Sequence, residues 1–299
     1  MVSNRKKSAR ERNRQQVLKV LNARRRQQRR RRLWLRVGAP VLVVLLVVAT
    51  MVLVKLTGRQ GATADAASDQ SSPAPAAVVS GVTALPTTVS DTVGAGSAGQ
   101  VLTRISGAPL TVDGLPRVVY VGAEYCPYCA AERWPLVIAL ARFGTFGGLG
   151  ATTSSPDDVY PSTATLSFHG STYHSDYLAF SPYEIQSNLR QGSGYATLDI
   201  VPAADEQLVQ KYNPKGSIPF LDLGNSFALV GATYDAGLLA GLTRQQIVAR
   251  IADPSDPVSK AVVGNANVIT AALCTLTGEQ PAAVCNSSAV VAGKRKLPS

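Results

Sequence analysis

Residues 117–134 read RVVYVGAEYCPYCAAERW, an apolar run followed by two cysteines three positions apart. The run from Arg117 to Gly122 is typical of a buried strand, and the pattern from Pro127 to Arg142 predicts a helix. Cys126 then lies at the positive amino end of that helix, where unpaired N–H groups lower the pKa of a thiol. Cys129 lies one turn further in. The stretch therefore predicts thiol–disulfide chemistry, with Cys126 as the nucleophile and Cys129 as the resolving thiol.

The segments around this stretch predict the other elements of an α/β domain over residues 99–290. Gly224-Asn225 between two apolar runs is typical of a β-hairpin, and Thr243 with Gln246 forms a capping box. The predicted elements are strands at 163–168, 219–223 and 227–230, an extended or irregular segment at 173–185, and helices at 204–212, 243–252 and 256–276. This order predicts a thioredoxin-like fold, a central mixed sheet flanked by helices, with an insertion within residues 156–213.

Four residues near the cysteines are candidates for a substrate groove. In thioredoxin-like folds a cis-proline lies opposite the redox helix, and Pro219, which follows Ile218, has the matching place before the hairpin. A trans proline that opens an edge strand is the alternative, because cis X-Pro bonds are the minority. Pro127 and Tyr128 lie between the two sulfurs and complete the candidate groove.

Two other interpretations of Cys126 and Cys129 remain open. One is a purely structural disulfide, although so short a loop gains little entropic stabilisation. The other is a metal site completed by His169 and His174, the only two histidines, which follow Cys129 by about forty residues. That spacing is unlike a zinc finger, and we expect neither a metal nor another cofactor.

Cys274 and Cys285 predict a structural disulfide that ties the last helix to the tail. The chain has four cysteines, and an even number in an oxidising compartment is typical of disulfides. A loop of this length stabilises a protein by roughly 3 kcal/mol in the chain-entropy model.

The amino-terminal region predicts a membrane anchor. Residues 1–36 hold fifteen of the thirty Lys and Arg and one of the nineteen acidic residues, so the positive charge of the chain is local. The stretch from Val37 to Val54 has no charged residue and, as a helix, is about 27 Å long, close to the thickness of a bilayer core. A buried core helix and a cleaved signal peptide are the alternatives.

The charge bias predicts the orientation of the anchor. Basic flanks stay in the cytoplasm, so we expect a cytoplasmic arm at 1–32, a transmembrane helix at 33–57 and an extracytoplasmic domain at 99–290. Residues 58–98 are mostly Gly, Ala, Ser, Thr and Pro, which predicts a disordered linker. The arm is expected to contact anionic lipid. It is not expected to bind nucleic acid, because no aromatic residue precedes Trp34.

The sequence EYCPYCAAERW at 124–134, with FGTF at 143–146 and SPDDVYP at 155–161, resembles a prokaryotic family of membrane-anchored, thioredoxin-like proteins. That family is catalogued only as a domain of unknown function. The resemblance extends over residues 99–285 and includes Ile218 and Pro219. It implies the thioredoxin-like fold and a redox role, but no established substrate.

These observations together predict an extracytoplasmic thiol–disulfide oxidoreductase that acts on exported proteins, with a membrane thiol oxidase as its electron partner. The alternative is a redox-inactive or metal-holding binding module at the cell envelope. Thioredoxins carry a buried acid six residues before the first active cysteine, whereas Tyr120 occupies that position here. The route by which Cys129 gains and loses its proton is therefore not apparent from the sequence.

Overall fold

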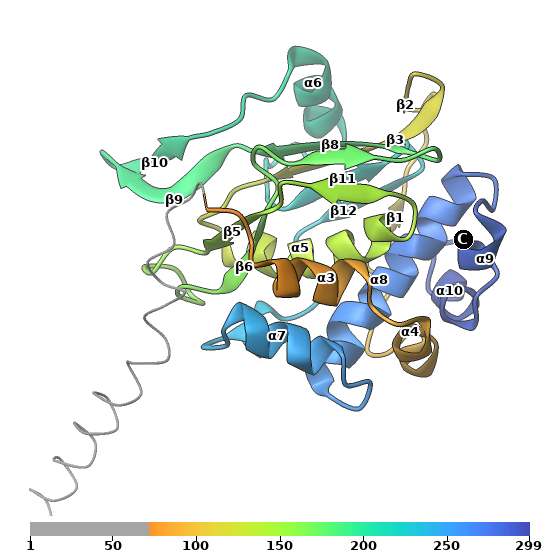
Figure 1. Ribbon diagram of the computed structural model, residues 1–299. Coiled ribbons are helices and arrows are strands. Elements are labelled where there is room, and N and C mark those ends of the chain that lie inside the picture. Colours follow the sequence, from red (N-terminus) through yellow and green to blue (C-terminus); the bar gives the residue numbers. More distant parts are fainter. Residues whose placement is uncertain (1–71) are drawn as a thin grey trace, which may run out of the picture. The chain divides into compact units, whose positions relative to one another are not determined.

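A mixed β-sheet forms the centre of the domain in the computed structural model, which describes residues 72–299 (Figure 1). Its strands are β1 (Thr103–Arg104), β2 (Thr111–Val112), β3 (Leu115–Gly122), β8 (Ala179–Glu184), β11 (Phe220–Leu223) and β12 (Phe227–Val230). The order is β1-β12-β11-β3-β2, and β8 also pairs with β3. Strand β8 runs parallel to β3, whereas β11 runs antiparallel to it. The predicted α/β class and central mixed sheet are confirmed.

Strand β3 is the interior strand that the apolar run predicts. Its residues from Val118 to Gly122 are all buried, because helices cover both faces of the sheet. Val118 and Tyr120 pack in the larger core with α5 (Pro127–Ala141) and α8 (Pro257–Leu276). Val119 and Val121 pack on the opposite face, in a smaller cluster that includes residues of α6 (Ala203–Tyr212). Figure 1 shows α6 on one side of the sheet and α8 on the other.

The predicted strand at 163–168 is confirmed, but it lies outside the central sheet. The run at 163–168 forms β6 (Ala164–Ser167), which pairs with β5 (Gly150–Thr153) outside the central sheet. The parallel neighbour of β3 is β8, a segment expected only to be extended or irregular. Pro182 weakened the strand signal there. A proline is tolerated because β8 pairs with β3 alone among the described strands, so its other edge needs no N–H donor.

Two short helices occupy part of the expected linker. They are α3 (Ala76–Thr83) and α4 (Thr87–Val93), so the prediction of disorder is wrong for residues 72–98. Val78 and Val82 of α3 are buried in the main core, although the segment has few large side chains. The Asn267 side chain of α8 donates to the carbonyls of Ser90 and Gly94. A few apolar residues suffice because the helices dock on a surface that the rest of the domain supplies.

The cytoplasmic arm at 1–32, the transmembrane helix at 33–57 and the first part of the linker lie outside the described residues. Within residues 72–299, none of the helices combines the length and the apolar character needed to cross a bilayer.

The helices after the hairpin begin where the capping residues predict. Thr243 and Gln246 form both bonds of the capping box at the start of α7 (Arg244–Ile251). The Asp256 side chain accepts from the Val258 N–H and caps α8. The remaining elements are β4 (Thr145–Gly147), β7 (Thr172–His174), β9 (Gln186–Gln191), β10 (Gly194–Thr197), the 3-10 helix η2 (Ala236–Leu239), α9 (Ala282–Cys285) and α10 (Ser288–Lys294).

Cys274 and Cys285 form the predicted disulfide, which joins the end of α8 to α9. Both residues are buried in the main core. The bond closes a loop with a sequence separation of 11 residues, and so restricts the unfolded chain.

Replacing both cysteines, as Cys274→Ala with Cys285→Ala, should lower the free energy of unfolding by about 3 kcal/mol, because the unfolded chain regains the entropy of the open loop. Urea denaturation of the full chain measures this change. A reductant should destabilise the wild type but not add to the loss in the double variant. A loss below about 1 kcal/mol would show that the loop constraint contributes little.

Candidate functional site

Cys126 and Cys129 lie at the start of α5, as the sequence predicts. Cys126 is the N-cap residue, and its sulfur accepts a hydrogen bond from the Cys129 N–H at 3.5 Å. Both cysteines are buried, but Cys126 is 5% exposed and Cys129 is 0% exposed, so Cys126 is the less enclosed of the two towards an incoming disulfide or thiol. Both cysteines are free thiols. The geometry distinguishes a reachable sulfur from an interior one.

The two thiols differ in acidity. The pKa of Cys126 is lowered to about 7, first by a hydrogen bond from the Cys129 side chain, against the opposing effect of burial. The N–H groups of Cys129 and Tyr128 and the charge of Arg133 lower it further. Burial, followed by the interaction with Cys126, raises the pKa of Cys129 well above its usual value. At neutral pH the reachable sulfur is therefore the one that ionises.

The predicted groove residues differ in burial and in their position relative to the Cys126 sulfur. Ile218 lies opposite it, with 3.9 Å between the sulfur and the Ile218 carbonyl oxygen, and the Ile218–Pro219 peptide bond is cis. Pro127 is the first residue of α5 and is buried, whereas Tyr128 is 42% exposed. The groove candidates thus come from two segments that the fold brings together, the start of α5 and the residues before β11.

Two pairs of tyrosines flank Cys126. Tyr125 stacks on Tyr195 of β10 with 4.3 Å between ring centroids, and the Arg190 guanidinium lies 4.5 Å from the centroid of the Tyr195 ring. Tyr128 meets the ring of Tyr160 edge-on, at 6.1 Å. Tyr160 and Tyr195 belong to segments far from the motif along the chain, so the sequence alone does not place them at the site. The clustering of tyrosines between 160 and 195 was the only signal for them.

A buried ion pair lies directly behind the cysteines. The Arg133 side chain, one turn after Cys129, binds both carboxylate oxygens of Glu184 at 2.7 and 2.6 Å. It also donates to the Ala123 carbonyl, in the loop that leads to the motif. Arg133 and Glu184 are both 0% exposed. The sequence does not indicate Glu184 as a partner of the motif, because only the parallel pairing of β8 with β3 brings it here.

The comparison with family models gives one match, the domain of unknown function DUF929, over residues 101–275. The match covers more than half of the chain. The chain belongs to the DUF929 family. No curated protein and no solved structure matches it. The matched region of this DUF929 protein contains both cysteines of the motif and the cis-proline, while Cys285 lies beyond it.

A second acid of α5, Glu132, anchors the helix from the side of the hairpin. Its Oε2 accepts from the N–H and the hydroxyl of Thr233, each at 2.8 Å, while Oε1 has no hydrogen-bond partner among the described residues. Next to it, the Tyr234 hydroxyl donates to the Ala131 carbonyl, which Pro135 leaves without its helical partner. Burial raises the pKa of Glu132 to about 8, against the bonds from Thr233.

The histidines do not join the cysteines. His169 pairs with Asp199 at 2.7 Å between its Nδ1 and the carboxylate, and His174 lies in β7, opposite Thr145 of β4. Residues 72–299 contain no group of three or more His, Cys, Asp or Glu side chains placed to hold a metal ion.

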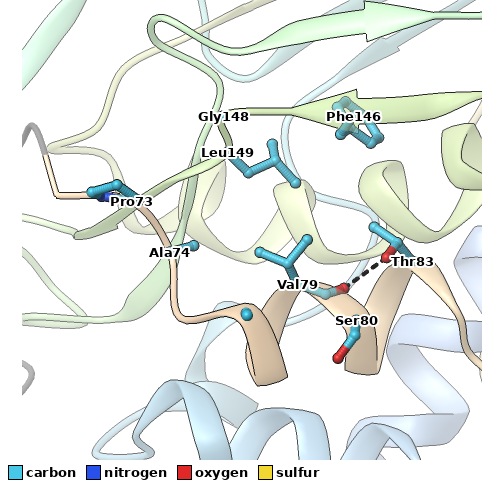
Figure 2. A pocket seen from close by; sticks show the side chains of 9 residues that line it. Pro73, Ala74, Val79, Ser80, Thr83, Phe146, Gly148 and Leu149 are labelled. Carbon is cyan, nitrogen blue, oxygen red and sulfur yellow. Dashed lines mark hydrogen bonds between the residues drawn. The ribbon is translucent and has the colours of Figure 1, made fainter.

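A cavity of about 330 Å³ lies between α3 and the β4–β5 turn, and none of its lining residues belongs to the candidate site (Figure 2). Its lining consists of Pro73, Ala74, Ala76, Val79, Ser80, Thr83, Phe146, Gly148 and Leu149. None of these residues carries a thiol, an acid or a base, so the cavity offers no chemistry of its own.

The buried Glu132 should make the free energy of unfolding depend on pH. The folded protein keeps the Glu132 proton up to about pH 8, whereas the unfolded chain releases it near the usual pKa of 4.5. The folded state therefore binds more protons between these values, and Glu132 makes stability fall as the pH rises through this window. At pH 8 the free energy of unfolding of the Glu132→Gln variant should exceed that of the wild type by about 2 kcal/mol or more. At pH 4.5 the variant should have no such advantage.

Urea denaturation at several pH values measures this difference. Glu206→Gln, which removes an exposed carboxylate of α6, is the matched control for the loss of one acid. Equal pH slopes for the wild type and Glu132→Gln would contradict the raised pKa.

Proposed function

We propose that this DUF929 protein is an extracytoplasmic thiol–disulfide oxidoreductase that acts on exported proteins through Cys126 and Cys129. The observation that supports it most directly is the contrast between the two thiols at the start of α5. One is reachable and has a pKa of about 7, whereas the other is fully buried and has a raised pKa. A structural disulfide needs no such contrast, but sequential exchange does, because one sulfur must attack first and the other must act within the protein.

The proposed reaction begins with the disulfide form of the pair. A substrate thiolate attacks the Cys126 sulfur, the bond to Cys129 breaks, and Cys129 leaves as a thiolate that takes a proton from water. A second thiolate of the same substrate then attacks the substrate sulfur that is bonded to Cys126. The Cys126 thiolate departs, and the substrate keeps a new disulfide. The two electrons remain on the enzyme dithiol. A membrane thiol oxidase, proposed as the electron partner, removes them.

A thioredoxin-like fold is part of the proposal. The sheet order β12-β11-β3-β8, with α5 after β3 and a cis-proline directly before β11, is the arrangement expected from that fold. The residues on either side of β8, between α5 and β11, form the additional segment, which supplies several small strands and α6. This agreement supports the assignment of Ile218 and Pro219 to a substrate groove beside Cys126.

The proposed location rests on the sequence and on the disulfide. The charge-free stretch from Val37 to Val54 and the basic residues before it support a single-span anchor with the domain outside. The Cys274–Cys285 disulfide supports an oxidising compartment. In this arrangement the basic arm lies against anionic lipid on the cytoplasmic side.

The acidity of Cys126 can be measured directly. In the reduced full chain, the rate of alkylation by iodoacetamide should rise with pH around a midpoint near 7 and modify Cys126 alone, because only its thiolate is reachable. In Cys126→Ser, the slow alkylation that remains should have its midpoint above 9, the usual value. A Cys126 midpoint near 9 would contradict the assignment of the nucleophile.

Trapping tests the reaction itself. In Cys129→Ser the resolving thiol is gone, so mixed disulfides between Cys126 and exported proteins should accumulate and disappear on reduction. The double variant Cys126→Ser with Cys129→Ser should form none. If Cys126 in Cys129→Ser still alkylates but traps no protein, the protein is a binding module and not an oxidoreductase.

A further inference from the structure

Two buried hydrogen-bond donors near Cys129 have no partner. The Tyr120 hydroxyl and Nη1 of Arg133 are both inaccessible to solvent and make no hydrogen bond with any residue in the described range 72–299. Folded proteins rarely leave a buried donor unpaired, so each such group calls for a physical reason.

The two donors meet at one end of the sheet. Alternation along β3 turns the Tyr120 side chain towards the core that contains α5. Its hydroxyl lies against Gly122, where an added Cβ would come within 2.1 Å of the hydroxyl oxygen. Gly122 is in register with Glu184, which holds Arg133. The hydroxyl and the guanidinium therefore lie together at the ends of β3 and β8.

The neighbouring polar groups give the hydroxyl no acceptor. Arg133 carries only donors. The carboxylate oxygens of Glu184 already accept from Arg133, and one of them also accepts from the Phe168 N–H. The Tyr120 ring is fixed edge-on against Phe168, at 5.1 Å between centroids. The other groups that interact electrostatically with the Tyr120 hydroxyl are the sulfurs of Cys129 and Cys126. The Cys129 interaction is the larger of the two, and Cys129 lies one turn before Arg133 on the same face of α5.

Cys129 must carry a negative charge in this buried place. It does so when it attacks the Cys126 sulfur of a mixed disulfide, and again when it is the leaving group in the reverse step. A buried thiolate is costly unless donors face it. Electrostatic interactions link the Cys129 thiol with Tyr120, Arg133, Glu184 and Cys126. The Arg133 charge favours the thiolate, the Glu184 charge opposes it, and the neighbouring acid Glu124 also interacts with this ion pair.

We propose that the Tyr120 hydroxyl, next to Arg133, donates a hydrogen bond to the Cys129 thiolate and stabilises it during disulfide exchange. This inference rests on the proposed function. In the release step, Cys129 gives its proton to water and its sulfur attacks Cys126. The new Cys126–Cys129 bond forms as the bond from Cys126 to the departing thiolate breaks. Tyr120 remains protonated throughout, because burial raises its pKa well above its usual value.

The release step can be observed with Ellman's reagent on the reduced full chain. Attack by Cys126 releases one thionitrobenzoate and leaves a second bound to it as a mixed disulfide, and attack by Cys129 then releases the second. The Tyr120→Phe variant should slow this second phase about tenfold at pH 7 and move its pH midpoint up by about one unit, because it removes one hydrogen bond to a charged sulfur. The first phase should change by less than about twofold.

A matched control separates this effect from a structural one. The Tyr173 hydroxyl donates to the Leu140 carbonyl, at the far end of α5. Tyr173→Phe should lower the stability of the protein without moving the midpoint of the second phase. Tyr120→Phe should not lower stability, because its hydroxyl has no partner among residues 72–299.

The outcomes distinguish the two proposals. If the wild type shows the second phase and Tyr120→Phe leaves its rate and midpoint within about twofold, the role of Tyr120 is refuted and the proposed function stands. If the wild type shows no second phase, Cys129 does not resolve mixed disulfides, and both proposals fail.

Discussion

The buried ion pair between Arg133 and Glu184 is the contact on which the arrangement of the site depends. It joins the helix that carries both cysteines to the strand that runs parallel to β3. The same guanidinium holds the Ala123 carbonyl, so it also fixes the loop before the motif. Neither side chain reaches solvent, and removing one partner would leave an uncompensated buried charge. The positions of helix, strand and loop are therefore fixed together.

Other contacts hold α5 from its remaining sides. Thr233 and Tyr234, which follow the hairpin, bind Glu132 and the Ala131 carbonyl. Across from them, the Thr165 hydroxyl of β6 donates to the Ala130 carbonyl. These bonds surround the first turns of the helix, where N–H groups face the Cys126 sulfur. A helix end held in this way keeps these N–H groups in place beside the Cys126 sulfur.

The insertion between α5 and the hairpin is part of the site. It supplies Glu184, and the Asp199 carboxylate that accepts from the Glu184 N–H also binds His169. It supplies Tyr195, which stacks on Tyr125 directly before the first cysteine. The segment that appeared from its length to be an addition to the fold therefore builds both the ion pair behind the cysteines and a wall beside them.

Local patterns in the sequence determined the elements whose signals are short-range. The apolar run from 117 to 122, the turn at Gly224-Asn225 and the capping residues Thr243 and Asp256 predict β3, the hairpin, α7 and α8, because each depends on neighbouring residues. The Cys126–Cys129 spacing likewise fixed the place of the motif at a helix start.

Only the tertiary structure decided which segment pairs with β3, that α3 and α4 order the end of the expected linker, and that Tyr120, Arg133 and Glu184 converge behind Cys129. The physical reason is that burial of charge and pairing of distant strands are set by contacts between residues far apart in the chain. Such contacts leave no periodic trace in a single sequence. Glu184 is the last residue of a half-buried strand that contains Pro182, and nothing near it along the chain indicates an arginine partner 51 residues away.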